Sequence, residues 1–406
     1  MYILSGLKII DGHGGEPITD KVVVIKDKMI HFIGDEADCK FDDEPFERID
    51  LPGMTLLPGF IDCHVHITFN PDNRIPPYMG PYQTGHDILF TAKNARLTLE
   101  AGFTTVRDVM SANEVIFPLR DSIARGETSG TRILSSGKCI TITGGHGTQF
   151  GLDGAIEADG PQEVLKAVRA QIKAGADVIK IMASRPAFSP PYYGREAYQV
   201  EEMLPGVEEA HRAGLRVCAH SHSKIQAMKN AILAGIDSIE HAAPVDDEIL
   251  DMMLERGTFM VPTLAVSPGL METVEDGTYP YGEEALKRSK GLTGETQDAV
   301  ARANERGVNI ALGTDAAMPR VWHGGNAWEF ELLVDCGLSP MDALIAGTSK
   351  AAQNIGREDT LGTIETNKLA DLVVVDGDPL EDIRILRDME KIKIVFKEGK
   401  IVKDRR

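Results

Sequence analysis

A junction of helix, glycine and short apolar strand recurs along the middle of this chain. Each copy ends a helical run at a glycine, which readily takes the positive φ that terminates a helix, and an apolar strand follows at once. The glycines of six such junctions are Gly102, Gly175, Gly214, Gly235, Gly257 and Gly307. Eight strands are predicted near residues 60–66, 103–107, 132–140, 177–182, 216–220, 237–241, 258–262 and 309–313. The alternation of eight strands with helices predicts an α/β protein with a (β/α)8 TIM barrel.

A doubly wound open sheet is the alternative for such a pattern. That fold usually carries a glycine-rich nucleotide-binding turn, and the sequence has none. Both ends of the chain are instead rich in short strands separated by Gly, Asp and Pro. With 406 residues there is room for one large α/β domain and a smaller one. We therefore predict a small β-sandwich domain formed by both termini, residues 1–57 plus 360–406, and a barrel over residues 58–359.

The composition restricts the partners and the compartment. The net charge of −19 argues against nucleic acid, because binding to phosphates requires concentrated Lys and Arg. Five scattered cysteines without a Cys-x-x-Cys pair suit a reducing cytoplasm better than a disulfide framework. No apolar run reaches membrane-spanning length, and the first residues lack the pattern of an export signal. We expect a cytoplasmic homo-oligomer that acts on a small molecule, with no nucleic-acid or membrane partner.

Residues 58–66 read Pro-Gly-Phe-Ile-Asp-Cys-His-Val-His and contain the strongest chemical signal of the sequence. Side chains two apart on a strand point to the same side, so His64 and His66 should lie together at the carboxyl end of the first barrel strand. Two neutral imidazoles at this spacing can hold one divalent metal ion. The alternative is a chance His-x-His, since the chain has 11 histidines.

Further residues with metal-binding chemistry stand on other predicted strands. At strand ends these are His220, His241 and Asp315, and within the apolar fourth strand there is Lys180. Taken singly, a strand-end histidine is more often structural, and an aspartate there is more often a helix cap. In a barrel, however, the carboxyl ends of all strands face one mouth, where active sites lie. The joint occurrence at equivalent places therefore predicts one shared site.

Lys180 needs a separate explanation, because an ammonium group cannot bind a metal and is costly inside a barrel. Burial lowers the pKa of a lysine in general, which leaves a neutral amine that can react with CO2. The resulting carbamate is an anion, and its two oxygens can bridge two metal ions. The alternative is a lysine whose side chain extends outward to solvent.

With these residues in place, the chain resembles the amidohydrolase superfamily over nearly its whole length. The matching pieces are residues 58–66, Lys180, Ala219-His220, Glu240-His241, Gly313-Thr-Asp315 and the composite β-domain. Within the superfamily it is most similar to the imidazolonepropionase-like branch, which includes metal-dependent Xaa-Pro dipeptidases. The motifs that carry this closer resemblance are Thr143-Gly-Gly-His146-Gly, Thr104-Thr-Val-Arg107-Asp108, Ile179-Lys-Ile-Met-Ala-Ser and His323-Gly-Gly-Asn326.

The resemblance implies a site with two divalent metal ions, zinc being the expected metal. It places His64, His66 and Asp315 on one metal and His220 and His241 on the other, with Lys180, as a CO2-derived carbamate, bridging them. His222 lies just beyond its strand and is a weaker candidate. A hydroxide shared by two metals is a nucleophile at neutral pH. Asp315 would accept its proton and pass it to the leaving nitrogen, which makes Asp315 and Lys180 the predicted catalytic residues.

Loops after the strands should select the substrate. The predicted substrate-binding residues are His146, Arg185, Tyr192 and His323, with Arg195, Arg320, Trp322 and the segment 69–83 as further candidates at the mouth. The alternatives are that His146 is an ordinary turn residue and that the loop after Ser184 is only a stiff surface loop. The chain also departs from the branch here: Arg185-Pro follows Ser184, where the branch has a glycine-rich loop.

The sequence thus predicts a metal-dependent hydrolase that cuts a C–N bond. The expected substrate is an amide with a free carboxylate, such as a dipeptide of the Xaa-Pro type or an N-acyl amino acid. A carbamate, urea, lactone or phosphotriester is the alternative, because the same pair of metals can attack each. A mononuclear deaminase is disfavoured by Lys180, and a non-catalytic relative is disfavoured because all six predicted ligands are present.

Overall fold

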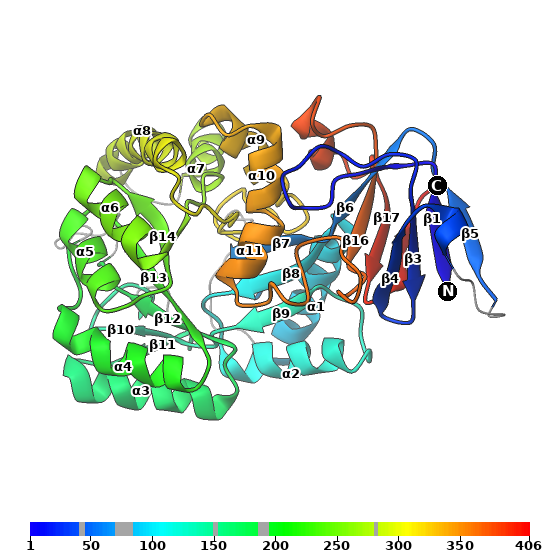
Figure 1. The fold of residues 1–406 in the computed structure, drawn as a ribbon. Helices are drawn as coiled ribbons and strands as arrows, with labels where there is room; N and C mark the ends of the chain where they lie inside the picture. The colour runs from blue at the N-terminus through cyan, green and yellow to red at the C-terminus, as the bar shows by residue number, and fades with distance from the viewer. Residues whose placement is uncertain (40–44, 70–83, 149–152, 186–194, 280–282) are drawn as a thin grey trace.

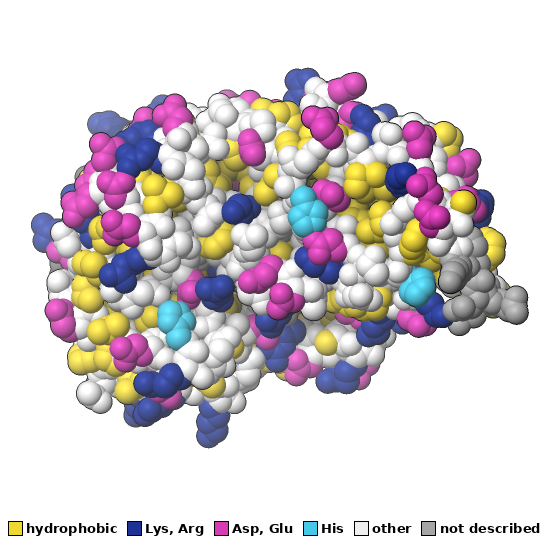
Figure 2. Space-filling model, in the orientation of Figure 1, with side chains coloured by type: hydrophobic (Ala, Val, Ile, Leu, Met, Phe, Trp, Pro, Cys, Tyr) yellow, Lys and Arg dark blue, Asp and Glu magenta, His cyan; other side chains and the backbone are white. Residues whose placement is uncertain are grey.

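The computed structural model describes residues 1–39, 45–69, 84–148, 153–185, 195–279 and 283–406. Parallel strands wrapped by helices occupy one side of the molecule, and sheets that contain both chain termini occupy the other (Figure 1). The surface in the same orientation carries acidic and basic side chains interspersed with each other (Figure 2). Within the described residues, no helix combines the length and the apolar character needed to cross a membrane.

The parallel strands form two sheets. One is three-stranded and consists of β7 (Phe60–Val65), β8 (Phe103–Asp108) and β9 (Arg132–Ser135). The other has the order β11 (Ala155–Glu157), β10 (Cys139–Thr141), β12 (Val178–Met182), β13 (Arg216–His222), β14 (Ser238–Ala243) and β15 (Phe259–Val261). Seven of the eight predicted barrel strands therefore exist, and the predicted third strand is divided into β9 and β10.

The prediction of a strand at 309–313 is wrong, because this segment is irregular and belongs to neither sheet. It nevertheless lies between β15 and β7: Met260 exchanges two backbone hydrogen bonds with it (2.8 and 2.9 Å), and the N–H of Cys63 donates a third (2.9 Å). Positive φ values at Asp315 and Ala317, 59° and 94°, turn the chain just beyond it and prevent a longer ladder. Within the described residues, the two parallel sheets are thus connected through this segment by isolated bridges rather than by one closed ladder.

Helices follow the strands and cover the outer side of the parallel sheets (Figure 1). They are α1 (Thr84–Glu100), α2 (Asn113–Ala124), α3 (Gly160–Ala174), α4 (Val200–Arg212), α5 (Ile225–Leu233), α6 (Asp247–Arg256), α7 (Val266–Glu275), α8 (Glu283–Arg306), α9 (Trp328–Asp335), α10 (Pro340–Ala346) and α11 (Ser349–Asn354). All six junction glycines have positive φ, between 68° and 98°. The repeated helix–glycine junction is therefore confirmed, and a strand follows it in every case except at Gly307, where the irregular segment 309–313 follows.

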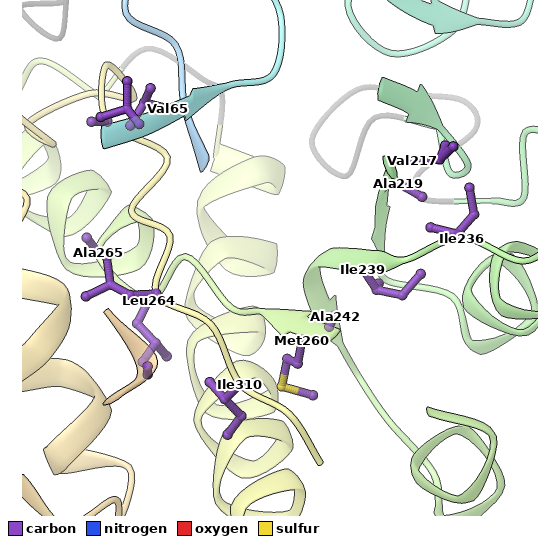
Figure 3. Packing of buried hydrophobic residues seen from close by; sticks show 14 of the residues in the cluster. Val65, Val217, Ala219, Ile236, Ile239, Ala242, Met260, Leu264, Ala265 and Ile310 are labelled. Atoms are coloured by element: carbon purple, nitrogen blue, oxygen red, sulfur yellow. The ribbon is translucent and has the colours of Figure 1, made fainter. Parts of the chain in front are cut away.

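Apolar side chains fill the space between the parallel strands and their helices. Figure 3 shows part of this core, with Val217 and Ala219 from β13, Ile239 and Ala242 from β14, and Met260 from β15. All five are buried. Burial of such side chains is the main favourable contribution to folding. It also fixes the strand register, because a slip by one residue would turn every side chain to the opposite face.

Two further sheets are built from the chain ends, one from N-terminal strands alone and the other from strands of both ends. Their strands are β1 (Tyr2–Ser5), β2 (Lys8–Ile9), β3 (Val22–Lys26), β4 (Met29–Gly34), β5 (Glu47–Asp50), β6 (Met54–Pro58), β16 (Leu372–Asp376), β17 (Ile392–Lys397) and β18 (Lys400–Asp404). Their orders are β4-β3-β1-β5 and β18-β17-β16-β6-β2. A common apolar cluster, including Leu4, Ile25 and Phe396, joins the two sheets. Only Gly59 separates β6 from β7, so these sheets fix the start of the strand that carries His64.

Candidate active site

Three of the predicted metal ligands form a buried trio at the carboxyl end of β7. His64 and His66 come from β7 and its end, and Asp315 is held beside them by a backbone hydrogen bond from its N–H to the carbonyl of His64 (2.8 Å). Asp315 Oδ1 lies 3.1 Å from His66 Nε2 and 3.5 Å from His64 Nε2. One potential ligand atom from each residue lies within 4.8 Å of the other two.

A second group of imidazoles adjoins the trio. His220 and His241, at the ends of β13 and β14, have ring centroids 4.6 Å apart. The His241 ring lies 5.0 Å from the ring of His64. His222 lies 5.1 Å from His241, so it belongs to the same group despite being the weaker candidate in the sequence. The ends of three separate strands thus bring the predicted histidine ligands together.

Lys180 lies in the middle of β12 and its side chain is only 1% exposed. The outward, solvent-facing alternative is therefore wrong. Its charge shifts the pKa values of His64, His220, His241 and Asp315, which means that the amine lies within electrostatic range of all four. The predicted six residues occupy one end of the parallel sheets.

Burial keeps the histidines of the site neutral. It lowers the pKa of His64 to about 4 and those of His220 and His241 well below their ordinary value, and the positive charge of Lys180 acts in the same direction. A neutral imidazole is the form that binds a metal. Burial alone would raise the pKa of Asp315, but the neighbouring imidazoles and Lys180 outweigh it and hold that pKa below its ordinary range. The site therefore offers neutral nitrogens and a carboxylate.

Several polar atoms at the site lack partners within the protein. Among the residues that the structure describes, Lys180 Nζ, His66 Nδ1 and His220 Nε2 are buried and have no hydrogen-bond partner. Buried polar atoms are normally paired, so this concentration indicates that a ligand completes the site. Imidazole nitrogens with a carboxylate are the donor set that suits zinc and similar divalent ions. The residues present therefore fit a metal centre.

Strained backbone marks the same end of the molecule. Seven non-glycine residues with positive φ lie at or just beyond the strand ends: Ser223, His241, Ala242, Thr263, Asp315, Ala317 and Arg320. The other four in the described chain lie in turns or bends near the terminal sheets: Asp20, Asp27, Asn367 and Glu398. Such conformations cost on the order of 1–3 kcal/mol each and persist where the surroundings enforce them, commonly at functional sites.

Sequence reasoning assigned no role to the groups that hold the candidate ligands. Glu240 Oε2 lies 2.6 Å from His64 Nδ1, and Arg107 Nη2 donates to Glu240 Oε1 at 2.8 Å. Asp62 accepts from the side chains of Thr314 (2.6 Å) and Asn326 (2.7 Å) and fixes the turn that leads to Asp315. The signal in the sequence was the presence of charged residues inside apolar strands.

The predicted substrate-binding residues have different outcomes. His146 stacks on His220, with ring centroids 4.2 Å apart, and His323 is buried and lies close enough to His66 to have its pKa affected by it. The N–H of Arg185 donates to the carbonyl of Arg195 (2.7 Å), so these arginines flank the base of their loop. Tyr192 and nearly all of the segment 69–83 lie outside the described residues.

Two further candidates at the mouth also have defined places. Arg320 forms an ion pair with Asp276 at the end of α7, so this cation is engaged within the protein. The Trp322 side chain is exposed. Neither residue belongs to the groups of imidazoles described above.

Comparison with known proteins gives a consistent result. The amidohydrolase family model matches residues 55–402. Ochratoxinase of Aspergillus niger is 32% identical over 99% of this chain and 86% of its own length. A solved Xaa-Pro dipeptidase with methionine bound in its active site is 33% identical, with 99% of both chains covered and a TM-score of 0.90. A prolidase complexed with N-methylphosphonate-L-proline is 30% identical over 100% of both chains, with a TM-score of 0.89.

The family matches most of the chain, and the relatives include enzymes named as dipeptidase, prolidase and ochratoxinase. Imidazolonepropionases are also among them. The resemblance predicted from the sequence is thus confirmed: this chain belongs to the amidohydrolase family and is a hydrolase that acts on C–N bonds.

Proposed function

We propose that this chain is a binuclear metal-dependent amidohydrolase that cleaves the amide bond of a small substrate with a free carboxylate. The proposed substrates are dipeptides of the Xaa-Pro type and N-acyl amino acids. The observation that carries the proposal is the buried trio of His64, His66 and Asp315 beside a second group of imidazoles. The family is in general metal-dependent, which supports this assignment.

The proposed metal ligands are the six residues that the sequence suggested. His64, His66 and Asp315 would hold one ion, and His220 and His241 the other, with zinc as the proposed metal. Lys180, buried in β12 and without a hydrogen-bond partner among the described residues, would serve as a ligand of both ions as its carbamate. The chemistry supplied by the metal pair, when bound, is polarisation of the scissile carbonyl and activation of water at neutral pH.

Asp315 would transfer the proton. Its carboxylate lies within 3.5 Å of two imidazoles, and its lowered pKa keeps it ionised at neutral pH, the form that would accept a proton from the attacking water. It would then deliver that proton to the leaving nitrogen, because an amide nitrogen is a poor leaving group until it is protonated.

Substrate contacts are proposed on the loops around the mouth. His146, stacked on His220, would contact the carbonyl or carboxylate of the substrate, with Arg185, Tyr192 and His323 as further contacts. Two of the similar structures are consistent with a small carboxylate ligand, since their names record bound methionine and N-methylphosphonate-L-proline.

The same proposal includes the finer architecture. The two parallel sheets, together with the segment at 309–313 that bonds to β15 and β7, would make up the (β/α)8 barrel over residues 58–359. The terminal sheets would form the β-sandwich domain of residues 1–57 and 360–406, since they share one apolar cluster.

A substrate screen tests the proposal. Zinc-loaded protein is incubated with Xaa-Pro and other dipeptides, N-acyl amino acids, carbamates, ureas, lactones and phosphotriesters, and product release is measured. We expect hydrolysis of the amides with a free carboxylate and loss of it in Asp315→Asn. Activity confined to lactones or phosphotriesters would exclude the proposed substrate class. One metal ion per chain with an unmodified Lys180 would exclude the binuclear site and favour a deaminase.

A further inference from the structure

The ring of His64 has two differently occupied nitrogens. Nε2 faces Asp315 in the trio, whereas Nδ1 lies 2.6 Å from Glu240 Oε2 on the other side of the ring. Glu240 comes from β14, next to His241, and is fully buried. This short contact determines which nitrogen of His64 remains available to a metal, because an imidazole that donates from Nδ1 presents its lone pair at Nε2.

The surroundings of Glu240 require that it act as an acceptor. Its Oε1 receives hydrogen bonds from Arg107 Nη2 (2.8 Å) and from Ser238 Oγ (2.7 Å). Ser238 Oγ in turn accepts from Arg107 Nη1 (3.1 Å), which sets the direction of its hydroxyl. The buried ion pair with Arg107 favours the ionised carboxylate of Glu240, which can only accept, so the proton of the short contact at Oε2 belongs to His64.

Arg107, which supports Glu240, is itself buried and hydrogen-bonded. It lies on β8, is 1% exposed, and its Nε donates to the carbonyl of Cys63 on β7 (2.6 Å). Its guanidinium therefore connects β7 and β8 of one parallel sheet with β14 of the other. A planar guanidinium with fixed donor directions suits this bridging position better than a lysine would.

The other candidate ligands have weaker support. His241 Nδ1 contacts Thr263 Oγ1 at 2.8 Å, and a hydroxyl can either donate or accept, so this contact does not select a tautomer. Within the described part of the chain, His66 Nδ1 and His220 Nε2 have no hydrogen-bond partner. Among these histidines, and counting only contacts within the described residues, His64 alone has at its Nδ1 a carboxylate that is itself paired with an arginine.

We propose that Arg107 and Glu240 are positioning residues that set the ring orientation and tautomer of His64, and through it the affinity of one of the two metal positions. The inference rests on the proposed metal centre. It adds an asymmetry: the metal position that uses His64 depends on this buried ion pair, whereas the position of His220 and His241 does not.

Metal binding to Glu240→Gln tests this without a substrate. Zinc affinity of each position is measured by chelator competition, and the bound metal environment by the absorption spectrum after replacement with cobalt. We expect the affinity of one position to fall about 10–100-fold, the usual effect of removing such a support, with the other position unchanged. Equal affinities in Glu240→Gln and the unmodified protein would overturn the inference.

Two further variants, Arg107→Gln and the double variant with Arg107→Gln and Glu240→Gln, distinguish a positioning role from a simple folding defect. Each single change leaves a buried charge unpaired, whereas the double variant removes both charges together and should fold better. We expect the double variant to recover thermal stability but to retain the weakened metal position. Recovery of full metal affinity in the double variant would contradict a positioning role.

Asp371→Asn is the matched control, because it breaks a different ion pair, with Arg132, far from the site. It should lower thermal stability and leave both metal affinities unchanged. An equal loss of metal affinity in Asp371→Asn and Glu240→Gln would show a general structural effect and overturn the inference. If no amide is hydrolysed by the unmodified protein while Glu240→Gln selectively loses one metal, the proposed substrate is wrong and the positioning role stands.

Discussion

The parallel strands carry a cluster of ionisable groups at each of their two ends, and the two clusters differ in completeness. At the amino-terminal end, Arg132 pairs with Asp371 and Glu398 and also donates to Thr105 Oγ1 (2.9 Å). Asp371 Oδ1 accepts from the N–H of Glu398 (2.7 Å). At the carboxyl end, the cluster around Lys180 contains buried polar atoms with no partner in the described chain.

We interpret this difference as one between groups that stabilise the fold and groups that are proposed to bind a ligand. A saturated ion-pair cluster contributes to stability and has no donor or acceptor left for chemistry. A cluster with unpaired buried atoms and strained backbone costs stability, and proteins retain such features where function requires them. The comparison therefore predicts that substitutions at the carboxyl end will lower activity, whereas equivalent substitutions at the amino-terminal end will lower stability and leave activity unchanged.

The largest effect is expected for Asp315→Asn. Loss of the proton acceptor should lower kcat by about 10²–10⁴-fold, the range for general acid–base groups. The metal-free variant should also be somewhat less stable than the metal-free unmodified protein, because the lowered pKa of Asp315 means that its ionised carboxylate stabilises the fold at neutral pH. Steady-state kinetics and thermal unfolding measure the two quantities. Unchanged kcat would remove Asp315 from the mechanism.

Lys180→Ala should lower activity strongly and selectively. If Lys180 acts as a carbamate, short carboxylic acids such as acetate or propionate can occupy its place and restore part of the rate. Rates are compared with and without these acids. Lys350→Ala serves as the control, because Lys350 donates to Asn309 Oδ1 and lies outside the candidate ligands; acids should not change its rate. A rate that does not fall in Lys180→Ala would contradict the bridging role.

Asp371→Asn should show the opposite behaviour. Removing one partner of a buried ion pair costs about 3–5 kcal/mol, and partial exposure of Arg132 places this pair at the lower end. The rate per folded molecule should remain unchanged. Urea unfolding and kinetics on the folded fraction measure the two effects. A loss of kcat equal to that in Asp315→Asn would end the distinction between the two clusters.

Removal of metal should lower the thermal stability of the protein, because the native state loses the ligand that its carboxyl-end cluster is proposed to bind. A ligand at 100 times its Kd stabilises the native state by about 2.7 kcal/mol, so chelation should lower Tm and zinc should restore it. The same shift is expected in Asp371→Asn, because this substitution leaves the proposed metal ligands unchanged. A chelator that changes Tm in neither protein would refute the fit between the residues and a metal.

The smallest effect concerns the pH dependence near the amino-terminal cluster. Burial, together with the positive charge of Arg132, lowers the pKa of Lys397 from 10.5 to about 8. The native state thus disfavours the charged amine, so this group destabilises the fold below pH 8 and the cost disappears as the pH rises toward 10.5. Lys397→Met should gain stability at pH 7 and lose that part of the pH dependence. Urea unfolding between pH 7 and 10 measures it, and parallel curves for both proteins would contradict the assignment.

Much of the fold was accessible from the sequence, because local patterns determine it. The junction glycines and apolar runs predicted seven strands, each within a few residues of its observed place. The segment at 309–313 failed as a strand because the turn at Asp315 and Ala317 depends on tertiary contacts that a local pattern does not contain.

The candidate site was only partly accessible for the same reason. Strand-end histidines can be recognised by their spacing, and the trio with Asp315 follows from the architecture. The pairing of Arg107 with Glu240 joins residues 133 apart in the sequence, and nothing near either residue indicates the other. The role of a buried charge depends on its partner, which only the folded structure reveals.

The continuity of β6 and β7 through Gly59 has a consequence for the order of folding. β6 pairs along its length with β16, a ladder that joins Pro58 to Leu372. Strand pairing between such distant segments is slow and follows local structure. During synthesis, the segment before His64 therefore lacks its partner until residues near Leu372 have left the ribosome. The candidate metal ligands of β7 are therefore made well before β16, the strand that completes the support of β6 beside them.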